Sequence, residues 1–180
     1  IDVSSPSFNA TKSVNEARQQ GAHVLIVASN TATLDQALAV NAANQTQLPL
    51  LGGDSLYNPK LLEVGGENAK GMVVAVPWVL LSDPNSSFAR SSRQLWGGDV
   101  NWRTVMSYDA TQALAQGLQR AGSTSRDALV AAMHSSGFSV EGATGAVRFL
   151  PSGDRNQAMQ LVVVSPGQRS GYGYDFVPAP

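Results

Sequence analysis

Cysteine is absent from this chain of 180 residues, which excludes disulfide bonds and thiolate chemistry. Charged residues are scarce, at 14% of the sequence, and 12 Lys+Arg against 13 Asp+Glu give a formal net charge of −1. Because it also has no basic cluster, the chain lacks the electrostatic footprint of a nucleic-acid-binding protein. No run of about 18 apolar residues occurs, so the sequence predicts no membrane-spanning helix. The remaining composition is that of a globular chain with a neutral polar surface.

The motifs of common enzyme and cofactor sites are missing too. There is no G-x-S-x-G nucleophile turn, and neither of the usual glycine-rich nucleotide-binding loops is present. His23 and His134 are far apart and have no carboxylate cluster at ligand spacing. Asp109 and Glu141 could each act as a general base, but the sequence places no partner near either. We therefore expect no enzyme activity, no metal and no cofactor.

The region before Pro77 alternates between strand and helix patterns. Short buried apolar runs predict strands at Val24–Ala28, Leu48–Leu51 and Met72–Val76. Capped stretches predict helices at Phe8–Gln20, at Leu34–Ala43, and from Pro59 to near Gly65. This order is typical of an α/β fold with a parallel sheet flanked by helices. Three strands make a thin sheet, so we expect further strands from elsewhere.

After Pro77-Trp78 the pattern becomes helical and then changes again. Helices are predicted up to about Trp96, at Arg103–Ala121 and at Arg126–His134. Ala146–Phe149 and Met159–Val164 are expected to form two strands around the turn Pro151–Asp154. The composition therefore shifts near Pro77–Asp83. Because the chain starts Ile1-Asp2-Val3, without an initiator Met or a signal peptide, we expect a processed or excised part of a longer protein.

Polar residues follow two of the predicted strands where those strands end. Ser29, Asn30 and Thr31 follow the first strand, and Asp54 and Ser55 follow the second after two glycines. Ligands bind at the carboxyl edge of a parallel sheet, so these segments predict a binding cleft. Hydroxyl, amide and helix-start N–H groups offer donors, and Asp54 offers an acceptor for an ammonium group, which together suit a zwitterion. The alternative is that both segments only cap the helices that follow.

Two aromatic residues near these segments have the same two interpretations. Trp78 lies at the expected boundary between domains, and Tyr57 lies shortly after Asp54. Either ring could stack on a ligand or could simply pack in the core.

The order of these segments resembles one known family. Three segments are similar to type I periplasmic binding proteins, above all to those of branched-chain amino-acid ABC transporters. They are GAHVLIVASNTATLDQAL, LPLLGGDS and the run Gly71–Pro77. Later segments agree: Ser107-Tyr108-Asp109-Ala110 opens the long helix, and Gly142-Ala143-Thr144-Gly145 precedes Val147-Arg148-Phe149. The resemblance covers nearly the whole chain, but only the C-terminal half of that two-lobe fold.

The resemblance implies an architecture. Residues 1–77 would be part of a second α/β lobe, residues 78–164 part of the first lobe, and residues 165–180 a hinge return and tail. The other half of the fold is missing, and another chain could supply it. Hinge motion is expected at Pro77-Trp78 and near Ser165-Pro166.

The resemblance also implies a function. It is non-catalytic binding of a small polar ligand, an amino acid or related metabolite, in an interlobe cleft of a periplasmic or extracytoplasmic substrate-binding protein. The partner would be an ABC permease or, if the chain is a sensing domain, a receptor or kinase; an α/β enzyme remains the other alternative. In the family, the acidic residue at the position of Asp54 often meets the ligand's amino group. The family position after the first strand is often aromatic, and Asn30 and Thr31 stand there instead, which favours a more polar ligand.

Overall fold

The computed structural model describes residues 3–180, so Ile1 and Asp2, at the start of the expected first segment, lie outside the described part. The chain divides into two compact units: unit 1 is Ile1–Val76 together with Gln160–Pro180, and unit 2 is Pro77–Met159. The chain therefore passes between units after Val76 and after Met159, whereas the sequence placed these boundaries after Pro77 and after residue 164. The second boundary falls earlier because the strand that begins at Gln160 pairs within unit 1.

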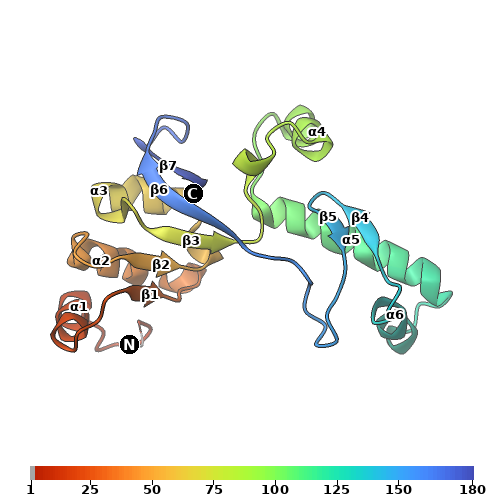
Figure 1. The fold of residues 1–180 in the computed structure, drawn as a ribbon, viewed down its shortest axis with the longest axis horizontal. Coiled ribbons are helices and arrows are strands. Elements are labelled where there is room, and N and C mark those ends of the chain that lie inside the picture. Colours follow the sequence, from red (N-terminus) through yellow and green to blue (C-terminus); the bar gives the residue numbers. More distant parts are fainter. Residues whose placement is uncertain (1–2) are drawn as a thin grey trace. The chain divides into compact units, whose positions relative to one another are not determined.

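Unit 1 is built on a five-stranded sheet of order β1-β2-β3-β6-β7 (Figure 1). The strands are β1 (Leu25–Val27), β2 (Leu50–Gly52), β3 (Val73–Val76), β6 (Gln160–Pro166) and β7 (Tyr174–Pro178). The first three are parallel neighbours, as the sequence predicts, whereas β6 and β7 join antiparallel. The further strands expected from elsewhere thus include two from the tail of this same chain.

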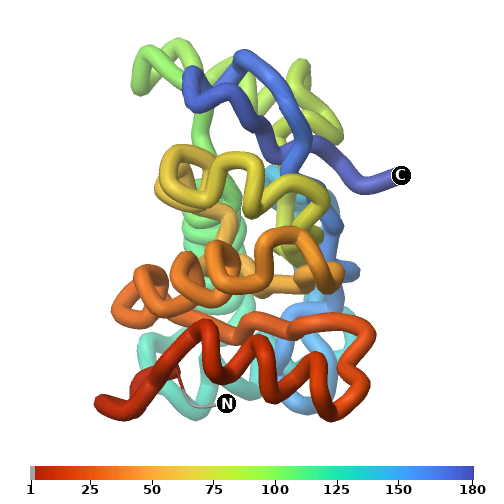
Figure 2. The backbone as a smooth tube through the Cα atoms, turned by 90° about the vertical axis from the view of Figure 1, so that its left-hand side faces the viewer, coloured from red at the N-terminus to blue at the C-terminus, as the bar shows by residue number. Residues whose placement is uncertain are grey.

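Helices lie along one side of unit 1 (Figure 2). They are α1 (Ala10–Gln19), α2 (Leu34–Asn44) and α3 (Gly66–Ala69), with the short turns η1 (Thr31–Thr33) and η2 (Asp54–Leu56) and the π-helical turn η3 (Leu61–Gly65). α1 begins at Ala10, two residues later than the expected Phe8, because Asn9 is its N-cap residue: the Asn9 side chain accepts a hydrogen bond from the Lys12 backbone N–H at 2.9 Å.

The two faces of the unit 1 sheet are covered unequally. Val27, Val74 and Val162 are buried on one face. Because side chains alternate along a strand, their neighbours point the other way, and Ile26 is 72% and Leu161 48% exposed. Leu51 and Val73, on the same face, are half-buried, so within the described residues this face of the sheet is partly exposed.

Unit 2 consists of three helices and a small hairpin. The elements are η4 (Leu80–Ser82), α4 (Ser87–Trp96), α5 (Trp102–Ala121), α6 (Arg126–Met133), β4 (Val140–Gly142) and β5 (Gly145–Val147). α5 runs beside the β4–β5 hairpin (Figure 1). One core cluster holds Trp78, Leu80, Ala89 and Val105. None of the helices described between residues 3 and 180 is both long and apolar enough to cross a membrane.

The expected hairpin around Pro151–Asp154 is wrong. β5 pairs with β4 instead, and only an isolated bridge between Phe149 and Arg155 spans that turn. The strand predicted from Met159 is β6, which pairs with β3 and β7. Burial explains this choice, because β6 places Val162 and Val164 in the core of unit 1.

Candidate functional site

The polar segments predicted as a site lie at one edge of the unit 1 sheet. Val27 of β1 is paired in register with Gly52 of β2, so Ser29–Thr31 and Asp54–Ser55 leave neighbouring strand ends. This is the carboxyl edge of the parallel strands, where α/β sheets bind ligands. We call these two segments the strand-end site.

The Asn30 side-chain oxygen is hydrogen-bonded to the backbone that follows it. Its Oδ1 accepts from Ala32 N at 2.9 Å and from Thr33 N at 3.1 Å, while Thr33 Oγ1 accepts from Asn30 N at 3.0 Å. This reciprocal capping box satisfies backbone N–H groups that the sequence interpretation offered to an anion. Other donors in this segment include the hydroxyls of Ser29 and Thr31 and the Asn30 amide nitrogen. Thr33 was not among the predicted site residues, although its spacing of three from Asn30 is the signature of such a box.

Ser29 carries a buried hydroxyl. Within residues 3–180 its Oγ is shielded from solvent and has no hydrogen-bond partner. A buried polar atom left unpaired costs about 1–3 kcal/mol, so a group from outside the described chain is expected to satisfy it.

Asp54 opens η2 and is half-buried. In the described part of the chain its carboxylate is met only by the Ser55 hydroxyl, which donates to Oδ1 at the long distance of 3.5 Å. No titratable side chain lies within hydrogen-bond reach of it there, so no acid–base pair forms. The carboxylate is therefore free to receive a cationic group.

Gly52 allows η2 to turn back against the sheet. A Cβ atom at this position would lie 2.4 Å from Leu56 Cδ1 and 2.9 Å from Met72 Cε. Only a glycine fits there without displacing these buried side chains. Gly52 thus sets the path that brings Asp54 to the strand-end site.

The two aromatic candidates lie in different surroundings. Tyr57 packs its ring against Phe176 of β7, with centroids 4.5 Å apart, and stays half-buried. Trp78 is only 7% exposed and belongs to the core cluster of unit 2. Its surroundings match the packing interpretation that the sequence left open.

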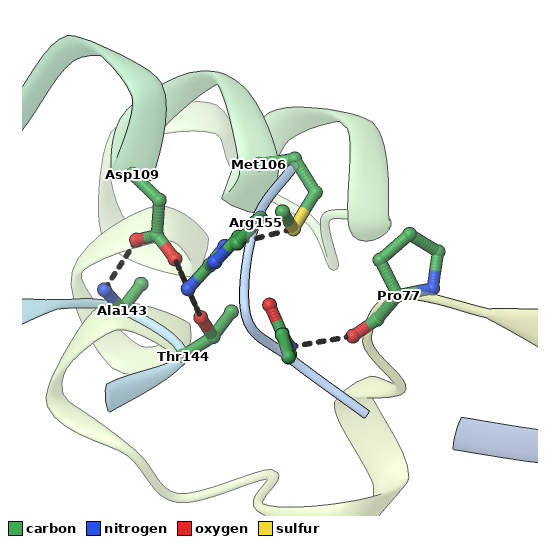
Figure 3. Close-up of polar contacts among 7 residues, drawn as sticks. Pro77, Met106, Asp109, Ala143, Thr144 and Arg155 are labelled. Carbon is green, nitrogen blue, oxygen red and sulfur yellow. Dashed lines mark hydrogen bonds and ion pairs between the residues drawn. The ribbon is translucent and has the colours of Figure 1, made fainter. Parts of the chain in front are cut away.

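Asp109, considered above as a general base, is the centre of a buried polar cluster in unit 2 (Figure 3). It is 1% exposed and accepts hydrogen bonds from Ala143 N at 2.6 Å and Thr144 Oγ1 at 2.5 Å. Arg155 Nη2 forms an ion pair with Asp109 Oδ2 at 2.9 Å and also donates to Thr144 Oγ1. A Cβ on Gly142 would lie 2.4 Å from Asp109 Oδ1. All of these contacts join the Asp109 carboxylate to the β4–β5 turn and to Arg155, so its role is structural.

A hydrogen bond on the surface of unit 1 shifts two pKa values. Tyr174 Oη donates to Glu67 Oε2 at 2.5 Å, and Lys70 Nζ donates to Glu67 Oε1 at 3.0 Å. The pKa of Glu67 lies below its ordinary value, mainly because of the hydrogen bond from Tyr174 and secondly because of the one from Lys70. The same hydrogen bond to Glu67 raises the pKa of Tyr174. In the described residues no group of three or more His, Asp or Glu side chains could hold a metal ion.

Comparison with known proteins adds a family and a fold. A family model described as "Periplasmic binding protein" matches residues 1–169. The Leu/Ile/Val-binding protein homolog 3 of Brucella melitensis is 29% identical over 108 residues, which is 60% of this chain and 29% of that protein.

Two solved structures show the same fold. A leucine binding protein from Thermotoga maritima has a TM-score of 0.75 at 19% identity, over 96% of this chain and 49% of that chain. A solute binding protein from R. palustris, in complex with benzoate, has a TM-score of 0.68 at 18% identity, over 96% of this chain and 47% of that one. The chain therefore spans about half the length of these solved relatives.

Proposed function

The chain belongs to the periplasmic binding protein family, and on this basis we propose that it takes part in binding a small polar ligand at the strand-end site. The ligand is an amino acid or a related metabolite, and the whole protein is the extracytoplasmic substrate-binding component of an ABC transporter. The binding is non-catalytic, and its partner is the transporter's permease.

One observation carries this proposal. The Asp54 carboxylate and the buried Ser29 hydroxyl lie at neighbouring strand ends, and neither has a strong partner within the described chain. If these side chains only capped helices, each would accept hydrogen bonds from backbone N–H groups of the first helical turn, as the Asn30 side chain does. An unsatisfied carboxylate and hydroxyl at one sheet edge are expected where a ligand supplies the complementary groups.

The ligand class follows from the chemistry of these residues. The relatives differ in what their names say they bind: leucine in one case and benzoate in another. A ligand with only a carboxylate would be repelled by Asp54, whereas an α-ammonium group would form a charge-assisted hydrogen bond with it. Asn30 and Thr31 add polar rather than aromatic surface, which favours a polar side chain on the ligand.

The test removes the charge of Asp54 without changing its shape. Asp54→Asn in the complete protein should weaken binding of an L-amino acid, found by thermal-shift screening, more than tenfold by calorimetry. Glu63→Gln is the matched control, because it removes one negative charge from an exposed position of the same unit. Equal affinity in Asp54→Asn and the parent would refute the assignment.

The partly exposed face of the unit 1 sheet supports a second part of the proposal. We infer that polypeptide equivalent to the other half of the solved relatives covers it, from this protein or another chain. Burying Ile26 and similar side chains would contribute about 25 cal/mol per Å² of apolar surface. The 180-residue chain alone should bind a hydrophobic dye, and Ile26→Ser should reduce that binding. Dye binding that Ile26→Ser leaves unchanged would place the exposed surface elsewhere.

A further inference from the structure

Unit 2 contains a cavity of its own between α4, α5 and the β4–β5 hairpin. Its volume is about 450 Å³, and small-molecule pockets in proteins measure about 300–1,000 Å³. α4 forms one wall, Tyr108 of α5 contributes to a second, and the hairpin residues 141–143 form a third. All three elements belong to unit 2, so the cavity is formed within one compact unit.

Three aromatic rings and a leucine give the cavity apolar walls. Phe88 and Tyr108 pack against each other with ring centroids 5.0 Å apart and planes tilted by 55°. Leu95 and Trp96 also line the cavity, and they are 71% and 59% exposed. A tryptophan that lies this open to water at a cavity wall is typical of a binding surface, where its ring becomes buried against a ligand.

The charge of the cavity is negative. Among the described residues that line it, Glu141 alone carries a formal charge. Glu141 is exposed on β4, and within residues 3–180 its carboxylate has no hydrogen-bond or ion-pair partner. Ser91 and Ser92 add neutral hydroxyl groups to the wall. The cavity therefore offers a cation both a carboxylate and aromatic ring faces.

Two arginines of the same helices have other partners. Arg93 of α4 donates from Nε to Asp99 Oδ1 at 2.6 Å. The Arg103 guanidinium of α5 lies over the Trp102 ring, 4.4 Å from its centroid. Neither arginine lines the cavity, so neither neutralises Glu141 there. A cation that pairs with Glu141 in this cavity is therefore expected to come from outside the described chain.

We propose that this cavity binds a small organic cation whose ammonium group carries methyl or other alkyl substituents. The ring faces of Trp96 and Tyr108 attract the positive charge, and the Glu141 carboxylate opposes it with a negative one. The alkyl substituents make apolar contacts with the rings and with Leu95. This proposal is independent of the strand-end site, because that site lies in unit 1.

Choline and its uncharged carbon analogue, 3,3-dimethylbutan-1-ol, have the same shape and so test the role of charge. In the complete protein, choline should bind at least about fivefold more tightly than the alcohol, followed by NMR through the Trp96 indole resonance. Trp96→Leu identifies this resonance by its loss and keeps an apolar side chain at an exposed position. Equal affinity for the two compounds, or no binding of choline, would overturn the proposal.

Glu141→Gln tests the carboxylate, because it removes the charge and keeps a side chain of the same size. It should weaken choline binding in calorimetry at least about fivefold, as should Trp96→Leu through loss of the ring face. Asp127→Asn is the matched control, because it removes an exposed negative charge of unit 2 outside the cavity. Equal losses in Glu141→Gln and Asp127→Asn would show a diffuse attraction between charges and contradict a built site.

The accessibility of Trp96 separates a ligand cavity from a surface that other polypeptide covers. Acrylamide quenches the fluorescence of exposed indoles, and the difference between the complete protein and its Trp96→Leu variant isolates the signal of Trp96. We expect this signal to be readily quenched, and choline to reduce the quenching. A Trp96 signal that acrylamide does not reach would show that further polypeptide fills the cavity, and the proposal would then be wrong.

Discussion

The ion pair between Asp109 and Arg155 allows a quantitative prediction about the stability of unit 2. Arg155→Met removes the cation and keeps most of the side chain's length. It leaves the Asp109 carboxylate, which is 1% exposed, with two hydrogen bonds from neutral groups, Ala143 N and Thr144 Oγ1. A negative charge would then be buried without a counter-charge.

The expected cost follows from burial. Removing one partner of a buried ion pair costs about 3–5 kcal/mol. The Arg155 side chain is 16% exposed, so water can partly replace it and the lower end of this range, about 3 kcal/mol, is expected. Unit 2 is the size of a small domain, for which about 1 kcal/mol lowers the melting temperature by about 4–8 °C. The unit 2 transition should therefore fall by about 12–24 °C.

The assay is calorimetry combined with hydrogen exchange, which assigns the loss to unit 2. Asp109→Asn provides a double-mutant cycle, because it removes the buried charge and keeps an acceptor for Ala143 N. The double variant should be less destabilised than the sum of the two single variants. A cost of Arg155→Met below about 1 kcal/mol, typical of an exposed ion pair, would refute the reasoning.

Three further predictions concern unit 1. Gly52→Ala overpacks buried Leu56 and should cost about 1–3 kcal/mol in urea unfolding, whereas an unchanged midpoint would show that the side chain simply moves aside. Asn30→Ala should cost about 1 kcal/mol by the same measurement, and Asn30→Asp, which keeps the capping oxygen, should recover most of it. Tyr174→Phe removes the donor and should raise the pKa of Glu67 towards its ordinary value in an NMR titration. Because a lowered carboxyl pKa adds stability that is lost as pH falls through the folded-state pKa, this variant should lose less stability on acidification; an unmoved Glu67 pKa would contradict the cause assigned.

Local signals in the sequence predicted most of the helices and the parallel strands. The helix ends were predicted less well: the caps in the structure are Asn9, Ser86 and Ser125, each of which accepts a hydrogen bond from the backbone of the first turn, whereas the first helix was expected from Phe8. Continuous apolar runs identified β1 to β3 because strands buried in a sheet need them. These signals act over a few residues, so the sequence alone reveals them.

Strand partners depend on distant residues, and there the sequence was less informative. The turn at Pro151–Asp154 suggested a hairpin, but β6 gains more by burying Val162 against β3, far earlier in the chain. β4 was missed because its sequence, Val140-Glu141-Gly142, has no continuous apolar run. β7 was missed because its surroundings are rich in glycine and tyrosine.

The strand-end site shows the same division. Its location followed from the general rule that ligands bind at the carboxyl edge of parallel strands. The same rule could not predict which of its atoms remain available for a ligand. The capping box between Asn30 and Thr33 pairs backbone N–H groups that the sequence analysis treated as available. Burial of the Ser29 hydroxyl depends on packing that no local pattern encodes.

The topology of the unit 1 sheet determines which unit is completed first during synthesis of the chain. Two of its five strands, β6 and β7, come from the last part of this sequence, whereas unit 2 is one continuous segment between them and β3. As the ribosome emits the chain, unit 2 has all its residues before unit 1 does, and domains generally fold as they emerge. β3 then waits, with one hydrogen-bonding edge unpaired, until the chain beyond Gln160 arrives.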